Sequence, residues 1–243
     1  MNPFLRKENY KNIIIAQNAP YDIKAKLRDM GYNIIDSIKA DFLYDSIAYH
    51  PDIVLHPLDD RNLFIAKNLF EEYKQILGKY NLNLIPTNRE FRSEYPNYIG
   101  LNIGRVRDYY IHSKNTDSRA IEEFKKKGIK NIFVKQGYSK CSTLNIKENI
   151  IITSDRGIEK ELKKYDEIEV YYIDPRGIEL EGMEYGFIGG CGIMISEKDL
   201  ILTGHTNNMR DSKLFHQILN KYEINVNYLS DKGIIDIGGF IVF

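Results

Sequence analysis

Apolar and polar positions follow one recurring order along the chain. Stretches with helical spacing lead to short apolar runs typical of buried strands, and a polar bend then precedes two further apolar runs. The best-defined case has a strand at 131–134, a bend at 136–141 and paired strands at 144–146 and 150–152. This pattern predicts a repeating unit of helix, strand, bend and hairpin.

The expected helices begin at polar residues and end at glycines or polar residues. The clearest one follows Thr116 or Asp117, either of which can cap its first turn. Glu122 lies early in this stretch, and the lysines at 125–127 come just before Gly128. This order of charges complements the helix dipole, so the lysines are interpreted as a solvated helix face.

The order of elements recurs five times, with a period of roughly 43 to 49 residues, which lies in the range of repeat proteins. The units are predicted at 18–66, 67–112, 113–154, 155–205 and 206–243. In the first two units the first hairpin strands are expected at 53–55 and 98–103, the latter followed by a turn at Gly104 and Arg105.

The fifth unit ends one strand short, and the apolar strand at 12–16 has no partner within its own unit. We expect this strand to pair with 240–242, because each otherwise leaves an open sheet edge. The sequence thus predicts a single α/β domain over 1–243, a five-unit propeller with pseudo-five-fold symmetry whose ring is closed by the N-terminal strand. The alternative is an ordinary α/β sheet whose alternating elements mimic repeats.

Composition narrows the choice of partners. Lys+Arg and Asp+Glu number 34 each in 243 residues, so no overall charge attracts nucleic acid, and no nucleic acid partner is expected. No apolar run approaches the roughly 20 residues that span a bilayer, and the N-terminus lacks a signal peptide core. With only two cysteines, we expect a cytoplasmic protein with free thiols and no membrane partner. The oligomeric state is left open.

Cofactor and metal signals are not found in the sequence. Gly186 to Gly192 is glycine-rich, but no helix follows it, which a nucleotide-binding fingerprint requires. The histidines and the two cysteines do not have zinc-ligand spacing. We therefore expect no cofactor and no metal.

Several segments carry a family resemblance. They are His50-Pro-Asp52, Gln136-Gly-Tyr-Ser-Lys-Cys-Ser142, Thr153-Ser-Asp155, Gly186-Phe-Ile-Gly-Gly190 and Asp236-Ile-Gly-Gly239. Together with the five closing units, they resemble the pentein fold of the guanidino-group-modifying enzymes and, more closely, an uncharacterised bacterial family with that fold. The resemblance covers nearly the whole chain and implies the fold more strongly than an activity, since fold does not fix function.

In active penteins a nucleophilic cysteine begins the hairpin strand of the last unit after a glycine-rich approach, and a His-x-Asp/Glu motif lies two units earlier. Here Phe240 follows Gly238 and Gly239, and the matching bend of the middle unit has Gly137 and Tyr138 but no histidine. In the usual register of the family, the catalytic set is therefore absent.

A second register fits the ring equally well, because His50-Pro-Asp52 and Cys141 are also two units apart. We predict Cys141 as the nucleophile, His50 as the group that moves protons and Asp52 as a carboxylate that holds a cation. Lys140 or His50 is expected to lower the pKa of the thiol. The alternative is that Cys141 is a packing residue.

Polar residues at strand ends and bends complete the predicted pocket. The candidate ligand-binding residues are Asp36, Asn88, Asn97, Gln136, Lys140, Asp174, Asp231 and Asp236. Carboxylates in this set suit a cationic or guanidino small molecule, although aspartate and asparagine are also common in turns. Cys191, between Gly190 and Gly192, is interpreted as a packing residue.

Two functions follow from these observations. The first is a small-molecule hydrolase or amidinotransferase that uses Cys141 on a C–N bond of a guanidino or amidine compound. The second is a catalytically silent pentein-fold protein that binds a ligand or a macromolecular partner, which the phenylalanine at position 240 favours.

Overall fold

The computed structural model describes residues 2–5 and 10–243. Its strands form five sheets of three strands each. Apolar runs make the central strands, and each contains at least one isoleucine, whose β-branched side chain packs well on a pleated surface. In β1 (Asn12–Ile15), for example, Ile13, Ile14 and Ile15 are fully buried.

Four sheets share one topology, in which a hairpin supplies the first two strands and a parallel strand the third. In chain order their strands are β3 (Leu55–Pro57), β4 (Asn62–Ile65) and β5 (Asn83–Pro86); β6 (Gly104–Val106), β7 (Tyr109–His112) and β8 (Lys130–Phe133); β9 (Thr143–Lys147), β10 (Ile150–Thr153) and β11 (Glu169–Tyr172); β12 (Gly192–Met194), β13 (Asp199–Leu202) and β14 (Asn225–Tyr228).

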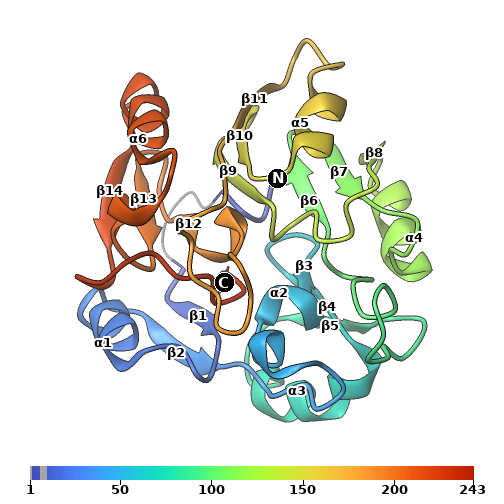
Figure 1. The fold of residues 1–243 in the computed structure, drawn as a ribbon. Helices are drawn as coiled ribbons and strands as arrows, with labels where there is room; N and C mark the ends of the chain where they lie inside the picture. Colours follow the sequence, from blue (N-terminus) through green and yellow to red (C-terminus); the bar gives the residue numbers. More distant parts are fainter. Residues whose placement is uncertain (1, 6–9) are drawn as a thin grey trace.

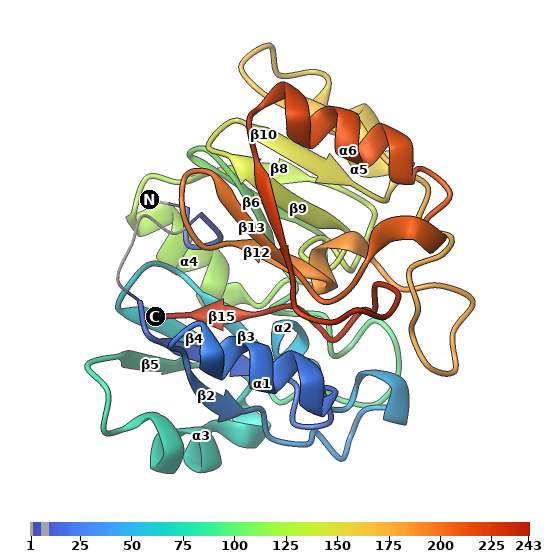
Figure 2. The same ribbon diagram turned by 90° about the vertical axis from the view of Figure 1, so that its left-hand side faces the viewer.

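The fifth sheet combines the two ends of the chain. Its order is β15 (Ile241–Val242), β1 and β2 (Asn33–Asp36). Ile13 pairs with Val242 and Ile14 with Ile241 in an antiparallel ladder, and β2 runs parallel to β1. Figure 2 shows β15 lying against the N-terminal part of the chain. The expected pairing of the two end strands is thus present, while the five sheets remain separate and the described residues form no single closed sheet.

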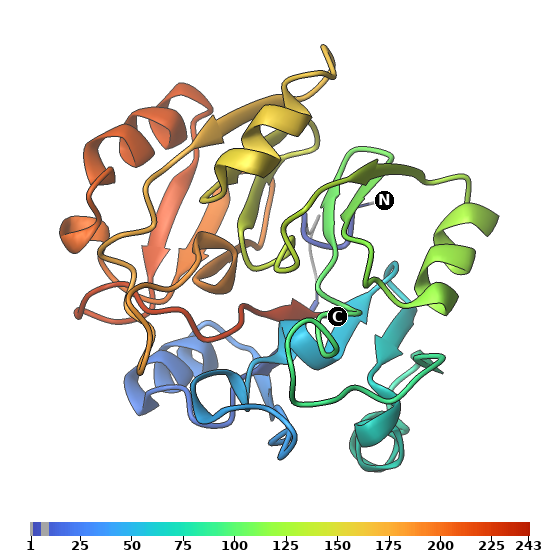
Figure 3. The same cartoon turned by 45° about the vertical axis from the view of Figure 1, so that its right-hand side comes forward.

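One helix joins the second strand of each sheet to the third. These helices are α1 (Tyr21–Asp29), α3 (Phe70–Leu77), α4 (Ser118–Lys126), α5 (Arg156–Leu162) and α6 (Ser212–Lys221). They lie on the outside of the molecule and follow one another around it in chain order (Figures 1 and 3). Asp117 and Asp155 cap α4 and α5 by accepting hydrogen bonds from backbone N–H groups.

Short helical turns complete the chain between the sheets. They are η1 (Asp45–Ile47), α2 (Pro51–Val54), η2 (Lys67–Leu69), η3 (Ile188–Gly190) and η4 (Thr206–Asn208). None of the helices in the described residues is long and apolar enough to cross a membrane.

Two hairpin predictions are wrong. Residues 53 and 54, expected at the start of a strand, belong to the helix α2, in which Pro51 occupies the first helical position, where its missing N–H costs nothing. In the second unit, Gly104 and Arg105 lie in β6 instead of a turn. Arg105 is fully buried, with its guanidinium over the Phe124 ring, and Arg107 with a positive φ makes the turn.

Each sheet straddles two of the predicted units, because a hairpin pairs with the strand of the following unit. The first hairpin strands β6, β9 and β12 face the middle of the molecule, where β9 lies against both β6 and β12. The third strands β5, β8, β11 and β14 lie farther out (Figure 1). The bends before the inner strands consequently converge on the centre, and they build the candidate site.

Candidate functional site

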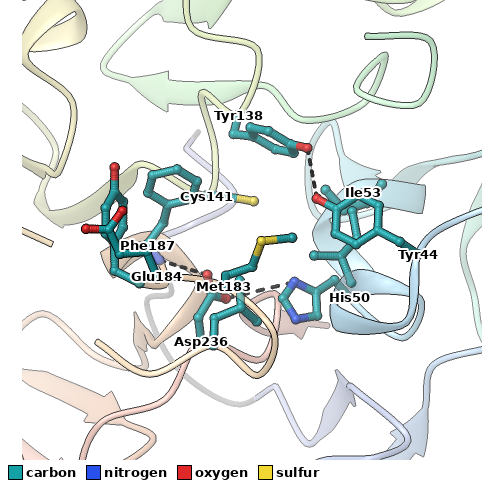
Figure 4. A pocket seen from close by; sticks show the side chains of 12 residues that line it. Tyr44, His50, Ile53, Tyr138, Cys141, Met183, Glu184, Phe187 and Asp236 are labelled. Atoms are coloured by element: carbon teal, nitrogen blue, oxygen red, sulfur yellow. Dashed lines mark hydrogen bonds and ion pairs between the residues drawn. The ribbon is translucent and has the colours of Figure 1, made fainter. Parts of the chain in front are cut away.

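A cavity of about 280 Å³ lies where these inner bends meet, and we call it the Cys141 cavity. Its lining is mostly apolar and aromatic, with a few polar groups, and consists of Tyr44, Ile47, His50, Ile53, Tyr138, Cys141, Leu180, Met183, Glu184, Tyr185, Phe187 and Asp236. Figure 4 shows the sulfur of Cys141 pointing toward the middle of this space. The predicted thiol and the predicted His50 therefore face the same cavity.

Cys141 and Asp52 are in direct contact. The thiol lies in the turn before β9, and Asp52 lies in α2, the turn before β3. Cys141 Sγ donates a hydrogen bond to Asp52 Oδ2 over 3.1 Å. Asp52 is 3% exposed, and its other oxygen, Oδ1, is buried without a hydrogen-bond partner in the described part of the chain.

Asn102 holds this pair in place. Its side-chain amide donates to Cys141 Sγ over 2.9 Å and to the backbone carbonyl of Asp52 over 3.0 Å. Its Oδ1 accepts from the backbone N–H groups of Lys140 and Cys141. Asn102 is fully buried, so one amide fixes the distance between two bends that are far apart in the sequence.

Lys140 supplies the positive charge beside the pair. It is 6% exposed, and its Nζ lies 3.5 Å from Asp52 Oδ2 while donating to the carbonyl of Gly189. A buried ammonium needs such partners, because its desolvation is costly. Lys140 therefore interacts with Asp52 from beneath the cavity and is not among the residues that line it.

His50 and Asp236 form the opposite wall. His50 Nδ1 lies 3.9 Å from Asp236 Oδ1. The carboxylate of Asp236 accepts hydrogen bonds from the N–H groups of Phe187 and Gly238 over 2.8 and 2.9 Å. A Cβ on Gly190 would lie 1.7 Å from Asp236 Oδ1, so the glycine-rich bend allows this wall to close up.

The electrostatic environment of the thiol differs from the prediction. Burial raises the pKa of Cys141 well above its usual 9.0, and the negative charges of Asp52 and Asp236 raise it further, while only Lys140 opposes them. Burial also raises the pKa of Asp52, against the lowering effect of Lys140 and His50. The predicted lowering of the thiol pKa is therefore wrong, because burial, together with two carboxylates, outweighs one ammonium.

A larger second cavity, of about 850 Å³, adjoins the first. Both cavities are bordered by His50, Asp236 and the segment 177–184, which lies between β11 and η3. We call this segment the acidic loop because it contains Glu179, Glu181 and Glu184.

Two of the predicted ligand-binding residues, Lys140 and Asp236, lie at the Cys141 site. The other six line neither cavity. Most of these have other partners near the outer strands. Two form ion pairs: Asp36 with Lys24 at 2.6 Å, and Asp174 with Arg176 and Arg210. Two donate hydrogen bonds from their side chains: Asn88 to Ser118, and Gln136 to Asp155. Asp231 is exposed, 4.0 Å from His205, and the backbone N–H of Asn97 donates to the carbonyl of Glu94 in a turn. The third strand of each sheet is the outer one, so polar residues at its end do not reach the centre.

Sequence reasoning missed Asn102, the aromatic walls and the acidic loop. Asn102 had a detectable signal, since it is a lone polar residue between the apolar Leu101 and Ile103. Tyr138 had no such signal. Its hydroxyl bonds those of Tyr98 and Tyr44, 2.6 and 3.2 Å away, across three different segments.

The second thiol differs from the first. Cys191 is fully buried and donates a hydrogen bond to the carbonyl of Phe187 over 3.2 Å. It does not line the Cys141 cavity. In the described residues no cluster of three or more His, Cys, Asp or Glu side chains is arranged to hold a metal ion.

Several solved structures resemble this fold over most of the chain. An amidinotransferase of saxitoxin biosynthesis from Microseira wollei is 10% identical, with a TM-score of 0.59, over 93% of this chain and 90% of that one. A Pseudomonas aeruginosa dimethylarginine dimethylaminohydrolase with bound citrulline is 12% identical, with a TM-score of 0.56, over 97% and 100%. A C. jejuni agmatine deiminase is 10% identical, with a TM-score of 0.56, over 95% and 89%.

These likenesses, at such low identity, show the fold alone, and the fold is that of the penteins. More specifically, the chain belongs to the family of unknown function DUF6873, whose model matches residues 14–241. No curated protein matches the chain.

Proposed function

We propose that the protein is a cysteine-dependent enzyme acting on a C–N bond of a small guanidino or amidino compound, as a hydrolase or an amidinotransferase. The observation that carries this proposal is the 3.1 Å hydrogen bond from Cys141 to Asp52 at the wall of a cavity. It joins a nucleophile to a proton acceptor beside His50 and Asp236. The fold shared with amidinotransferases and an agmatine deiminase supports the same class of reaction.

In the proposed reaction the sulfur of Cys141 attacks the central carbon of the guanidinium group, and the thiol proton passes to Asp52. The bond from this carbon to the departing amine then breaks, and protonated His50 gives that amine its proton. A thiouronium intermediate remains on Cys141. His50 next deprotonates water or an acceptor amine, which attacks the thiouronium carbon. The C–S bond then breaks, and the sulfur regains the proton held by Asp52. Transfer releases a guanidinium product, and hydrolysis releases a urea after its hydroxyl proton passes to solvent.

The raised pKa of the thiol has a role in this scheme. Without ligand, the neutral thiol is favoured by burial and by the nearby charges of Asp52 and Asp236. A cation in the cavity offsets these negative charges, and its own field favours the thiolate. Cys141 should therefore become nucleophilic only when a cationic ligand is present. In the absence of ligand the neutral thiol resists unwanted alkylation.

Turnover is the direct test. Wild type, Cys141→Ser and the matched control Cys191→Ala are incubated with arginine, agmatine and N-methylated arginines, and released ammonia or amine is measured together with product mass. We expect turnover by wild type and Cys191→Ala and none by Cys141→Ser. Activity that survives in Cys141→Ser, or no turnover of any guanidino compound, would contradict the proposal.

A catalytically silent binding protein is the second candidate. Phe240 is buried at the position where the usual register of the fold has its cysteine, and the Cys141 side chain is only 3% exposed. Binding of a guanidino compound to wild type, measured by calorimetry, together with no turnover in the same samples would favour this function.

The predicted cytoplasmic location, which rests on the two free thiols, stays a prediction.

We further propose that the five sheets form one propeller-like domain over 1–243, arranged in a ring with pseudo-five-fold symmetry. The pairing of β1 with β15 and the circular order of the outer helices support this arrangement. The ring matters for function because it brings bends from five separate units to one axis.

A further inference from the structure

The Cys141 cavity continues into the second cavity. The two share the lining residues His50, Leu180, Met183, Glu184 and Asp236. With a volume of about 850 Å³, the second cavity has room for the remainder of a small molecule whose reactive group lies at Cys141. A ligand extending from one to the other passes along His50 and Asp236.

Carboxylates dominate the charge of the second cavity. Its acidic lining residues are Asp45, Glu179, Glu181, Glu184 and Asp236. The one lysine or arginine found among its described lining residues is Lys39. The Nζ of Lys39 lies 3.7 Å from Asp41 and 3.9 Å from Asp45, so these two carboxylates already share its charge.

The three glutamates of the acidic loop form no such close pair, although the charge of Glu184 contributes to raising the pKa of Arg176. Within residues 2–5 and 10–243, Glu179, Glu181 and Glu184 take part in no ion pair with a lysine or arginine. Their charges therefore add to one another at one wall of the cavity, where they attract a cation and repel an anion.

A separate observation at the junction of the cavities also indicates a ligand. The side chain of His50 is 6% exposed, and it lines both cavities. Across the described residues its ring makes no hydrogen bond. Asp236 lies 3.9 Å away, and the charge of His50 also acts on Asp52. Buried polar side chains are normally hydrogen-bonded. The ring nitrogens of His50 are not among the fully enclosed unpartnered atoms of the described residues, so they face the cavities, where a polar ligand can bond them.

The Cys141 cavity offers a carboxylate-bearing ligand no lysine or arginine among the described residues. Two of the residues that line it, Glu184 and Asp236, are instead acidic. A buried carboxylate without a cationic partner is strongly disfavoured. An amino-acid substrate would thus place its carboxylate among like charges in either cavity.

We propose that the second cavity binds a protonated amine at the far end of the substrate. The preferred substrate is then a dication, with a guanidinium group at Cys141, an amine near the acidic loop and no carboxylate. This inference rests on the proposed function for the placement of the guanidinium group. It goes further by selecting aminoalkylguanidines over guanidino acids.

The test measures binding without chemistry. Calorimetry on Cys141→Ser compares three compounds of equal chain length: agmatine with an amine end, butylguanidine with an uncharged end and 4-guanidinobutanoate with a carboxylate end. We expect agmatine to bind about tenfold more tightly than butylguanidine, and 4-guanidinobutanoate to bind most weakly. Equal or tighter binding of the carboxylate compound, or no binding of agmatine, would overturn the inference.

A charge-matched pair of variants locates the effect. The acidic-loop variant Glu179→Gln/Glu181→Gln/Glu184→Gln should bring the ratio of agmatine to butylguanidine affinity toward one. The control Glu71→Gln/Glu72→Gln/Glu122→Gln, which changes exposed helix residues by the same charge, should keep the ratio of the parent. If both variants lower the ratio equally, overall charge explains the preference and the amine site is disproved.

The amine site and the proposed enzymatic function can fail independently of each other. If agmatine binds in the expected order but the wild type converts no guanidino compound, the amine site stands and the enzymatic proposal fails. If the wild type converts arginine as readily as agmatine, the enzymatic proposal stands and the amine site fails.

Discussion

Asp52 and Asp174 are both aspartates beside a strand of a three-stranded sheet, yet they have opposite environments. Asp52 precedes the inner strand β3, is 3% exposed and accepts a hydrogen bond from Cys141. Asp174 follows the outer strand β11 and pairs with Arg176 and Arg210 at the surface. The comparison teaches that the position of a strand within its sheet, rather than residue type, decides which polar groups converge on the centre.

The largest expected effect concerns β1, the middle strand of the sheet that joins the two ends of the chain. Deleting residues 1–16 removes β1, the middle strand of its sheet, and leaves β15 and β2 without a shared partner. We expect the truncated protein to lose its cooperative thermal unfolding transition. An unchanged melting temperature in circular dichroism would show that the fold does not depend on the pairing of β1 with its neighbours.

The next effect compares the two aspartates directly. Asp52→Asn should lower kcat/KM by about 10² to 10⁴-fold, because the proposed proton acceptor of Cys141 is lost. Asp174→Asn should change kcat/KM less than about twofold and the free energy of unfolding by less than about 1 kcal/mol. Steady-state assays of both variants on the best substrate make the comparison, and equal losses would end the distinction between inner and outer residues.

A matched pair of asparagines extends the comparison of inner and outer residues to the free energy of unfolding. Asn102→Ala removes an amide that serves Cys141, Asp52 and Lys140, and it should cost about 2 to 3 kcal/mol because buried polar groups lose their partners. Asn88→Ala removes an exposed amide at an outer strand end and should cost less than about 0.5 kcal/mol. Urea unfolding measures both, and similar costs would contradict the assigned environments.

The last effect is a loss of folding stability at alkaline pH. A buried thiol whose folded pKa lies above the unfolded value stabilises the fold fully below about pH 9, and this contribution is lost as pH rises through the folded pKa. Wild type should lose up to about 1.4 kcal/mol per pH unit more than Cys141→Ser in that range. Urea unfolding between pH 7 and 11 gives this difference, and parallel curves would mean that the pKa of Cys141 is not raised.

Much of the fold is readable from local sequence. Apolar runs mark the central strands, Asp117 and Asp155 mark helix starts, and the two unpaired end strands predict each other as partners. The β6 strand is not readable in this way. Burial of Arg105 over the Phe124 ring, which overrides the turn character of Gly104, depends on a helix in a later segment.

The candidate site is only partly readable from sequence. Cys141, His50 and Asp52 were predicted because a ring can be rotated. In the structure Cys141 and His50 line one cavity, and Asp52 accepts a hydrogen bond from Cys141. The outer strand ends were included because sequence patterns do not reveal which strand of a sheet is innermost. Asn102 and the acidic loop were missed because their roles arise from contacts between distant segments.

The central claim is that Cys141 is a nucleophile whose reactivity depends on a cation beside it. It is tested most directly by alkylating the native protein with cationic chloroacetamidine and with neutral chloroacetamide, and locating the label by mass spectrometry. The rate ratio of the two reagents at Cys141 should exceed that of N-acetylcysteine by about tenfold, and agmatine should protect the thiol. The same ratio as the free thiol, labelling of Cys191 first, or labelling of Cys141 only in denaturant would contradict the claim.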